Sequence, residues 1–240
     1  MIRHRRAIRV CALAACMSVA TAAAQAQQLT VLGSANPNLA GRANGYACCS
    51  GDASPGQASP FITVTSGSIL TFAVRGFSDF IGSQSTGNNP DGNVDAPLTN
   101  FGDGISAPTN VRWNALYGVF LDQNDPTGNA TPVTLDFSGG LNFASLAPLL
   151  GQIFFIGDGL TSDSNIGFNG TSQLFSTPTG ATRLFFGSGD GFGWFNNTGS
   201  FDVTVSGNVN TVPEPATVVL MLGGLLVIGA GARRRHVTAA

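Results

Sequence analysis

Short apolar runs separated by glycine-rich turns constrain the fold of this 240-residue chain more than any other feature. The chain holds 32 Gly, and pairs such as Ser66-Gly67 and Asp91-Gly92 stand between nearly all the runs. Residues 201–205 alternate apolar and polar side chains with the period of two of a half-buried strand. Many short strands of this kind predict an all-β fold, a single β-sandwich or jelly-roll-like domain. The candidate strands are residues 29–32, 61–64, 69–74, 116–121, 133–137, 152–156, 183–186 and 201–205, and the candidate helix is 143–150, interrupted by Pro148.

Charge is distributed unevenly between the ends and the middle of the chain. All 11 basic residues are Arg, and residues 27–212 hold four of them against twelve Asp, a net charge of −8. This excess excludes nucleic-acid binding by phosphate neutralisation and electrostatic attachment to an anionic membrane. His4 and His236 lie in the ends, so the middle has no imidazole for a catalytic triad or a zinc site. We therefore expect no enzyme, and the abundant Asp, Asn, Ser and Thr oxygens favour hard cations such as Ca²⁺.

The N-terminal segment has the pattern of a secretory signal. A basic stretch at residues 3–9 precedes an Ala-rich apolar stretch, and Ala24-Gln25-Ala26 forms a cleavage site before Gln27. Residues 1–26 are thus predicted to be a signal peptide. As an alternative, Cys16 follows a lipobox-like Leu-Ala-Ala and would be lipidated.

The C-terminal segment also has the pattern of a targeting signal. Pro213-Glu214-Pro215 precedes an apolar run at 216–232, and Arg233, Arg234 and Arg235 end it. The run reaches the lower length limit of a transmembrane helix, and the Arg cluster is expected to stay cytoplasmic. A permanent tail anchor is the simple alternative.

This order of motif, apolar run and Arg cluster resembles a PEP-CTERM sorting signal. The resemblance implies a Gram-negative, exopolysaccharide-making source and a partner exosortase, a membrane transpeptidase that acts at the motif. The protein would be anchored transiently in the membrane and then pass to the cell surface or biofilm matrix. The expected division is 1–26 signal peptide, 27–207 β-sandwich domain, and 208–240 linker and sorting signal.

Two adjacent cysteines, Cys48 and Cys49, remain after signal removal. Neighbouring Cα atoms lie about 3.8 Å apart, which is below the usual span of a disulfide. The alternatives are a strained vicinal disulfide, two free thiols, or bonds to another chain. The oxidising surroundings of an exported protein favour the vicinal bond.

Four Asp-rich segments are candidates for cation binding. Residues 91–95 have the D-x-N-x-D spacing, but Ala96 and Gly102 stand where an EF-hand needs Gly and Glu. This segment, 122–126 and 158–169 are predicted to be solvated loops. In the fourth segment, Asp190 and the pair Asn196-Asn197 flank a loop that folds back between two candidate strands. Their oxygens suit calcium, although Asn-Asn-Thr-Gly is also a good turn.

Residues 179–201, which contain this loop, resemble the C-terminal half of the PA-IL-type galactophilic lectins. Those are calcium-dependent bacterial lectins with a small β-sandwich, and residues 66–80 are similar to their early strand region. Three departures are visible: the spacing from Asp190 to Asn196 is one residue shorter than in the lectins, their sugar-contacting His has no counterpart, and residues 82–107 are inserted. The resemblance implies side-chain calcium ligands at Asp190, Asn196 and Asn197, and main-chain ligands at Phe80 and at Gly193 or, instead, Trp194.

Two functions fit these observations. One is calcium-dependent carbohydrate binding, in which Phe192 and Trp194 lie against the apolar face of a sugar or, alternatively, belong to the core. The other is a structural protein of the exopolysaccharide matrix, in which calcium only stabilises the fold.

Overall fold

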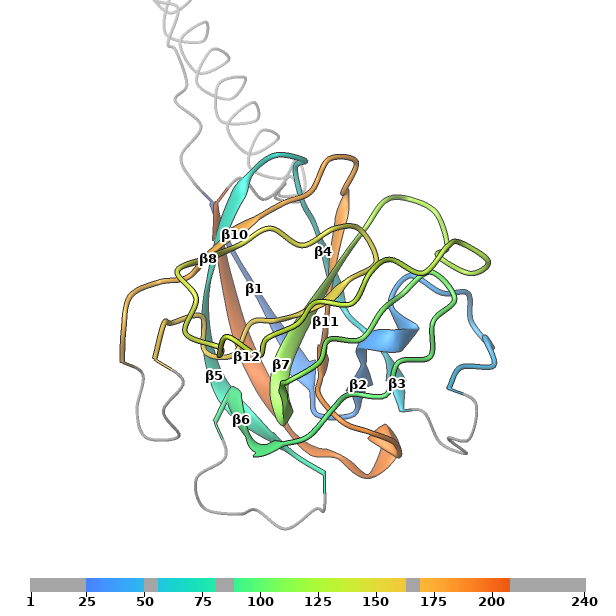
Figure 1. The fold of residues 1–240 in the computed structure, drawn as a ribbon, viewed down its shortest axis with the longest axis horizontal. Coiled ribbons are helices and arrows are strands. Elements are labelled where there is room, and N and C mark those ends of the chain that lie inside the picture. Colours follow the sequence, from blue (N-terminus) through green and yellow to red (C-terminus); the bar gives the residue numbers. More distant parts are fainter. Residues whose placement is uncertain (1–24, 50–55, 81–88, 163–168, 208–240) are drawn as a thin grey trace, which may run out of the picture.

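A computed structural model describes residues 25–49, 56–80, 89–162 and 169–207, and its regular structure is almost entirely β. Two main sheets face each other (Figure 1), so the predicted all-β, sandwich-like fold is confirmed. The first sheet has the order β1 (Gln25–Leu32), β12 (Thr198–Gly207), β5 (Ile69–Asp79), β10 (Leu174–Ser176) and β8 (Ser145–Leu146). The second has the order β4 (Phe61–Thr63), β11 (Arg183–Ser188), β7 (Arg112–Leu121) and β6 (Asp91–Asp95), and β9 (Ile153–Phe155) also pairs with β7. A small parallel sheet consists of β2 (Ala35–Asn36) and β3 (Gln57–Ala58). Two single 3₁₀ turns, η1 (Pro37–Leu39) and η2 (Trp194–Asn196), complete the regular structure of the described residues.

Strand β12 lies between β1 and β5 in the first sheet. It pairs antiparallel with β5 from Thr198↔Asp79 to Gly207↔Leu70, and with β1 on its other edge. Phe201, Val203 and Val205 are buried, whereas the side chains between them are exposed or half-buried. The predicted alternation is confirmed, and it fixes which face of β12 meets the second sheet.

Phenylalanine fills the space between the two main sheets. The rings of Phe120 and Phe154 stack with centroids 5.0 Å apart, and Phe72 meets Phe175 edge to face at 4.9 Å. All four side chains are buried. Offset and edge-to-face pairs of this kind add stability beyond the burial of apolar area.

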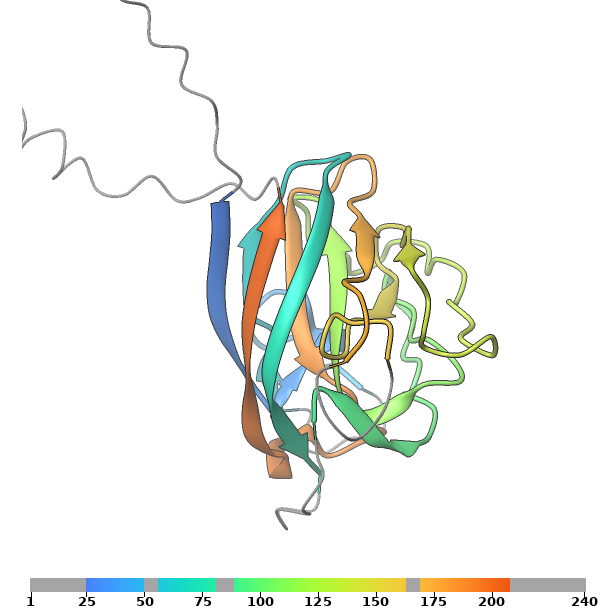
Figure 2. The ribbon, with the colours of Figure 1, turned by 90° about the vertical axis from the view of Figure 1, so that its left-hand side faces the viewer.

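The second sheet is covered on both faces. Every residue of β7 from 114 to 121 is buried, which is unusual for an antiparallel strand in a two-layer sandwich. Its outer face carries Tyr117, Val119 and Leu121, which pack with Ile105 and Phe137 from irregular segments. Figure 2 shows these segments as a further layer beside the second sheet.

Two segments differ from the predictions. Residues 143–150 are not a helix: Ser145 and Leu146 form β8, which pairs in parallel with β10. Residues 133–137 are not a strand, since they contribute only an isolated bridge between Asp136 and Thr109. Some apolar side chains of both segments, such as Phe137 and Phe143, pack on the core from an irregular backbone. Their spacing therefore follows neither the period of a helix nor that of a strand.

The two ends of the described chain lie side by side, because Gln25 pairs with Gly207. Ala26 and Gln27, which flank the predicted cleavage point, lie within β1, whereas Ala24 lies outside the described residues. Among the described residues, no helix is long and apolar enough to cross a membrane. The predicted transmembrane run at 216–232 lies outside them.

The ring of Phe154 is a sensitive test of this core. Phe154→Ala removes a fully buried ring stacked on Phe120, and we expect it to lower the free energy of unfolding by about 3–5 kcal/mol. Val133 is 73% exposed, so Val133→Ala should stay within about 0.5 kcal/mol of the native chain. Urea unfolding measures both, and equal values for the two variants would contradict the packing described.

Candidate functional site

The loop between β11 and β12, residues 189–197, lies at the opposite end of β12 from the chain termini (Figures 1 and 2). Gly193 adopts a left-handed conformation with φ 77°, which L side chains rarely adopt, and the turn η2 follows it. The backbone N–H groups of Asn196 and Asn197 donate to the carbonyls of Gly193 and Trp194. The predicted fold-back of this loop is therefore present as a hydrogen-bonded turn.

Trp194 anchors the loop to the core. Its side chain is fully buried, and its indole Nε1 donates to the carbonyl of Ser188 at 3.0 Å. The suggestion that Trp194 offers a face to a sugar is therefore wrong, because core packing covers its ring. Phe192 and Phe195 of the same loop are instead 51% and 64% exposed.

Asp190 and Asn197 point inward. Their residues are 3% and 7% exposed, respectively. Asp190 Oδ1 accepts a hydrogen bond from the N–H of Gly191 at 2.6 Å, and Asn197 Nδ2 lies 3.4 Å from Ser188 Oγ. Asn197 Oδ1 is buried and accepts no hydrogen bond from the described part of the chain. A buried acceptor without a donor costs about 1–3 kcal/mol, and a bound cation or water would offset this cost.

Phe80 reaches the same region from the end of β5. Its N–H donates to Asn114 Oδ1 at 3.1 Å, and the N–H of Asn114 donates to the carbonyl of Gly189 at 2.8 Å. Asn114 is buried, has φ 64°, and links the end of β5 to the start of the loop. Sequence reasoning missed Asn114, because a single Asn within an apolar strand carries no spacing signal.

The five predicted calcium ligands thus lie at one end of the sandwich, but they differ in exposure and in hydrogen bonding. Asn114 links Phe80 to Gly189, which precedes Asp190, and Asn197 contacts Ser188. The side chain of Asn196 is exposed, and the Gly193 carbonyl already accepts the N–H of Asn196. No group of three or more His, Cys, Asp or Glu able to hold a metal occurs in the described residues, so the arrangement relies on amide and main-chain oxygens.

The other Asp-rich segments divide into two kinds. Asp91 is 1% exposed and accepts the N–H of Asp158 at 2.8 Å, so the prediction of a solvated loop at 91–95 is wrong. Asp158 is also buried, and this burial raises the pKa of its carboxyl. Asp122 caps the exposed turn at Asn124, as predicted. Residues 163–168 lie outside the described residues.

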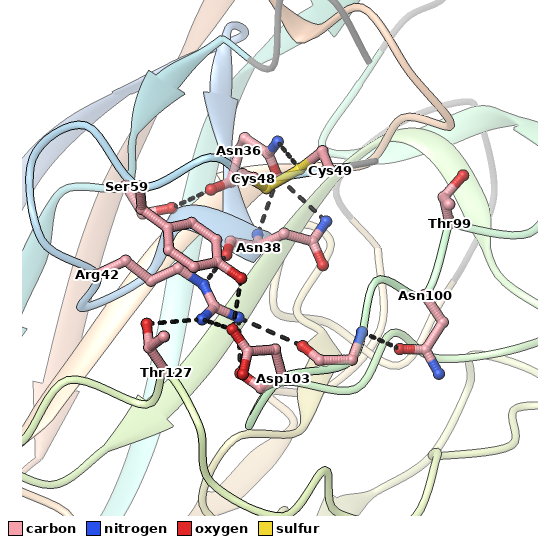
Figure 3. Close-up of a disulfide and its surroundings, with 12 residues drawn as sticks. Asn36, Asn38, Arg42, Cys48, Cys49, Ser59, Thr99, Asn100, Asp103 and Thr127 are labelled. Atoms are coloured by element: carbon pink, nitrogen blue, oxygen red, sulfur yellow. Dashed lines mark hydrogen bonds and ion pairs between the residues drawn. A yellow bond between two sulfur atoms is a disulfide. The ribbon is translucent and has the colours of Figure 1, made fainter. Parts of the chain in front are cut away.

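Cys48 and Cys49 form the vicinal disulfide that the sequence favoured, with Cα atoms 3.7 Å apart (Figure 3). Cys49 has φ 71°, and its sulfur lies 3.5 Å from Asn36 Nδ2. Asn36 also accepts from Asn38 through Oδ1, and its carbonyl accepts from Ser59 Oγ. Because the bond joins adjacent residues, it closes no long loop and constrains the unfolded chain little.

Beside the disulfide, Arg42 joins two irregular segments (Figure 3). Its side chain is 2% exposed and pairs with Asp103 at 3.2 Å, while its guanidinium lies 4.2 Å from the centre of the Tyr46 ring. Asp103 accepts hydrogen bonds from the Tyr46 hydroxyl at 2.5 Å and from the N–H of Gly128 at 2.7 Å. The Tyr46 bond, then the Gly128 bond and Arg42, hold the pKa of Asp103 below 3.8.

A lowered pKa in the folded state means that the Asp103 carboxylate stabilises the fold above its unfolded pKa. This stabilisation is lost as pH falls through the folded pKa, below 3.8. We expect Asp103→Asn to melt below the native chain at pH 7, with the gap closing as the solution is acidified below that value. Asp202→Asn is the matched control, because Asp202 is exposed and Asn keeps an acceptor for Thr30. A gap that does not change with pH would contradict this role of Asp103.

Comparison with known proteins identifies one segment. Residues 211–235 match a family model described as a PEP-CTERM protein-sorting motif. The match contains Pro213, Glu214 and Pro215 as well as the three terminal Arg residues, all outside the described part of the structure. No curated protein matches the chain. The motif implies that the chain is exported, is held transiently in the membrane, and is processed by an exosortase.

Proposed function

We propose that this exported chain is a non-enzymatic surface or matrix protein of a Gram-negative bacterium, and that its sandwich binds calcium and, through it, carbohydrate. The observation that carries the proposal is Asn197 Oδ1, a buried acceptor to which no donor among the described residues is hydrogen-bonded. It lies in the loop that also holds the buried carboxylate of Asp190. Oxygens of this kind are what Ca²⁺ prefers in proteins.

Four residues of this loop and of the end of β5 offer oxygens of suitable chemistry. The carboxylate of Asp190 supplies negative charge, and Asn197 Oδ1 and the Phe80 carbonyl supply neutral oxygens. Asn196, one residue away and exposed, can add a further amide oxygen. Calcium takes six to eight oxygens, so a bound ion would keep open positions for the vicinal hydroxyls of a sugar.

Two exposed aromatic side chains support carbohydrate as the ligand. Phe192 and Phe195 stand on the loop itself, and Phe192 is held edge to face by Phe101 at 5.8 Å. Exposed rings beside a polar site suit sugars, which present one apolar face and several hydroxyls. Thr99, from the inserted segment, also donates to the Gly191 carbonyl at 2.7 Å, so this segment borders the same site.

One observation favours the alternative of a structural matrix protein. Burial of Trp194 ties the loop to the core, so a cation there would stabilise the whole sandwich. In that case calcium would rigidify the loop without any sugar being bound.

Calcium binding at this loop is tested with Asp190→Asn, which keeps an acceptor for the Gly191 N–H but removes the charge. We expect calcium at about 100 times its Kd to stabilise the native chain by about 2.7 kcal/mol, and the variant to lose most of this gain. Asp122→Asn makes the same change at an exposed turn and should keep it. If Asp190→Asn gains as much stability from calcium as the native chain, the site is wrong.

A glycan array probed with and without chelator separates the two functions. Binding to a glycan that disappears with chelator and in Asp190→Asn is the expected result for the lectin-like function. Calcium-dependent melting without binding to any glycan would establish the structural role instead.

The sorting motif is tested by replacing Pro213, Glu214 and Pro215 with Ala. Without processing, the 17-residue apolar run at 216–232 would remain a span of about 26 Å and retain the chain in the membrane. We expect the variant in the membrane fraction and the native chain outside it. Replacing Asn208 and Asn210 of the linker with Ser is the control and should leave the distribution unchanged. If the variant without the Pro-Glu-Pro motif is also absent from the membrane fraction, the prediction is wrong.

A further inference from the structure

A groove of about 600 Å³ lies on the side of the second sheet that the irregular segments cover. It runs between the start of β7, the end of β6 and the turn at 137–141. Its volume falls within the range of about 300–1,000 Å³ that is typical of small-molecule sites. None of its lining residues belongs to the candidate calcium ligands.

Hydrogen bonds to one carboxylate fix the rim of the groove. Asp136 Oδ1 accepts from Asn110 Nδ2 at 2.7 Å and from the N–H of Ser138 at 2.9 Å. Thr109 and Asp136 are also bridged through the backbone. The two sides of the rim are thereby held in place before a ligand arrives, which lowers the entropic cost of binding.

The charges that line the groove cancel. Arg112 Nε pairs with Asp95 Oδ1 at 3.0 Å, and the Asp95 side chain is 87% exposed. A groove with one cation and one anion in contact favours neither an anionic nor a cationic ligand. A neutral ligand with both donors and acceptors can bind at this pair without displacing it.

The floor of the groove is apolar. Val111, Phe137 and Leu141 line it and are buried, whereas Asn110 and Ser138, which also line it, are exposed. A ligand that fits must therefore present an apolar face inward and hydroxyl groups to the rim. A pyranose ring has this distribution, with C–H groups on its face and hydroxyls at its edge.

Trp113 separates this groove from the calcium loop. Its indole Nε1 donates to the carbonyl of Pro97 in the groove wall at 3.1 Å. On the loop side, its ring packs against Phe80, and a Cβ on Gly191 would lie 2.8 Å from Trp113 Cζ2. The groove therefore lies next to the calcium loop but is lined by different residues.

We propose that this groove is a second, calcium-independent binding site for a neutral saccharide. The proposal goes beyond calcium-dependent binding at the loop and does not rest on it. The ion pair and the rim side chains donate to and accept from sugar hydroxyls, and the apolar floor holds the face of one ring.

The experiment measures binding of cellohexaose, maltohexaose and mannohexaose to the full-length chain in EDTA, by titration calorimetry. The variants are Asp95→Asn, which changes a highly exposed side chain, and Arg112→Met, which keeps the aliphatic stem and removes the donors. Arg75→Met is the matched control, an exposed strand Arg on the outer face of the first sheet. Melting curves establish that each variant is folded.

We expect at least one neutral hexasaccharide to bind the native chain in EDTA. Both groove variants should weaken that binding about tenfold or more, and Arg75→Met less than about twofold. EDTA removes calcium from the loop, so a failure of the calcium site is distinguishable from a failure of the groove. No neutral saccharide binding in EDTA, binding unaffected by the groove variants, or binding only to an anionic polysaccharide such as alginate would each overturn the proposal.

Discussion

Burial of β7 on both faces is the constraint on which the rest of the molecule depends. One face, which carries Leu116 and Phe120, packs in the core shared with the first sheet, and the other must be covered by chain that has no regular ladder of its own. Such a covering layer still has to satisfy its polar backbone. It does so through single carboxylates that accept several donors, Asp103 at one place and Asp136 at another. Asp103 and Asp136 are therefore structural residues of this layer.

The parts of the fold that sequence alone predicts are those in which side chains follow a period. The alternation at Phe201, Val203 and Val205 identified β12 and its buried face. The burial of Asp91 was not predictable, because it depends on a contact with Asp158, which is distant in sequence. The burial of Trp194 was not predictable either, because the chain must turn back for its indole to reach Ser188. The irregular segment at 143–150 was mistaken for a helix because its apolar residues pack on the core without a strand or helix period.

The candidate site shows the same division. Asp190, Asn196 and Asn197 were identified from their types and spacing, and the turn at Gly193 brings them to one end of the sandwich. The role of Asn114, which joins the end of β5 to the loop, could not be predicted, because Asn114 is a lone polar residue in a buried strand. Exposure decides which aromatic can meet a ligand: Phe192 and Phe195 are available and Trp194 is not.

The position of β12 has a mechanical consequence. The strand begins directly after the candidate loop and ends where the chain continues toward its sorting segment, and β1 and β5 hydrogen-bond along both its edges. A pulling force between a ligand held at the loop and an anchor beyond Gly207 would run lengthwise along β12. The covalent backbone of this one extended strand would carry that force, so the hydrogen bonds on its two edges would bear little of it. A force between a ligand at the loop and the C-terminal sorting segment would therefore leave the rest of the sandwich largely unloaded.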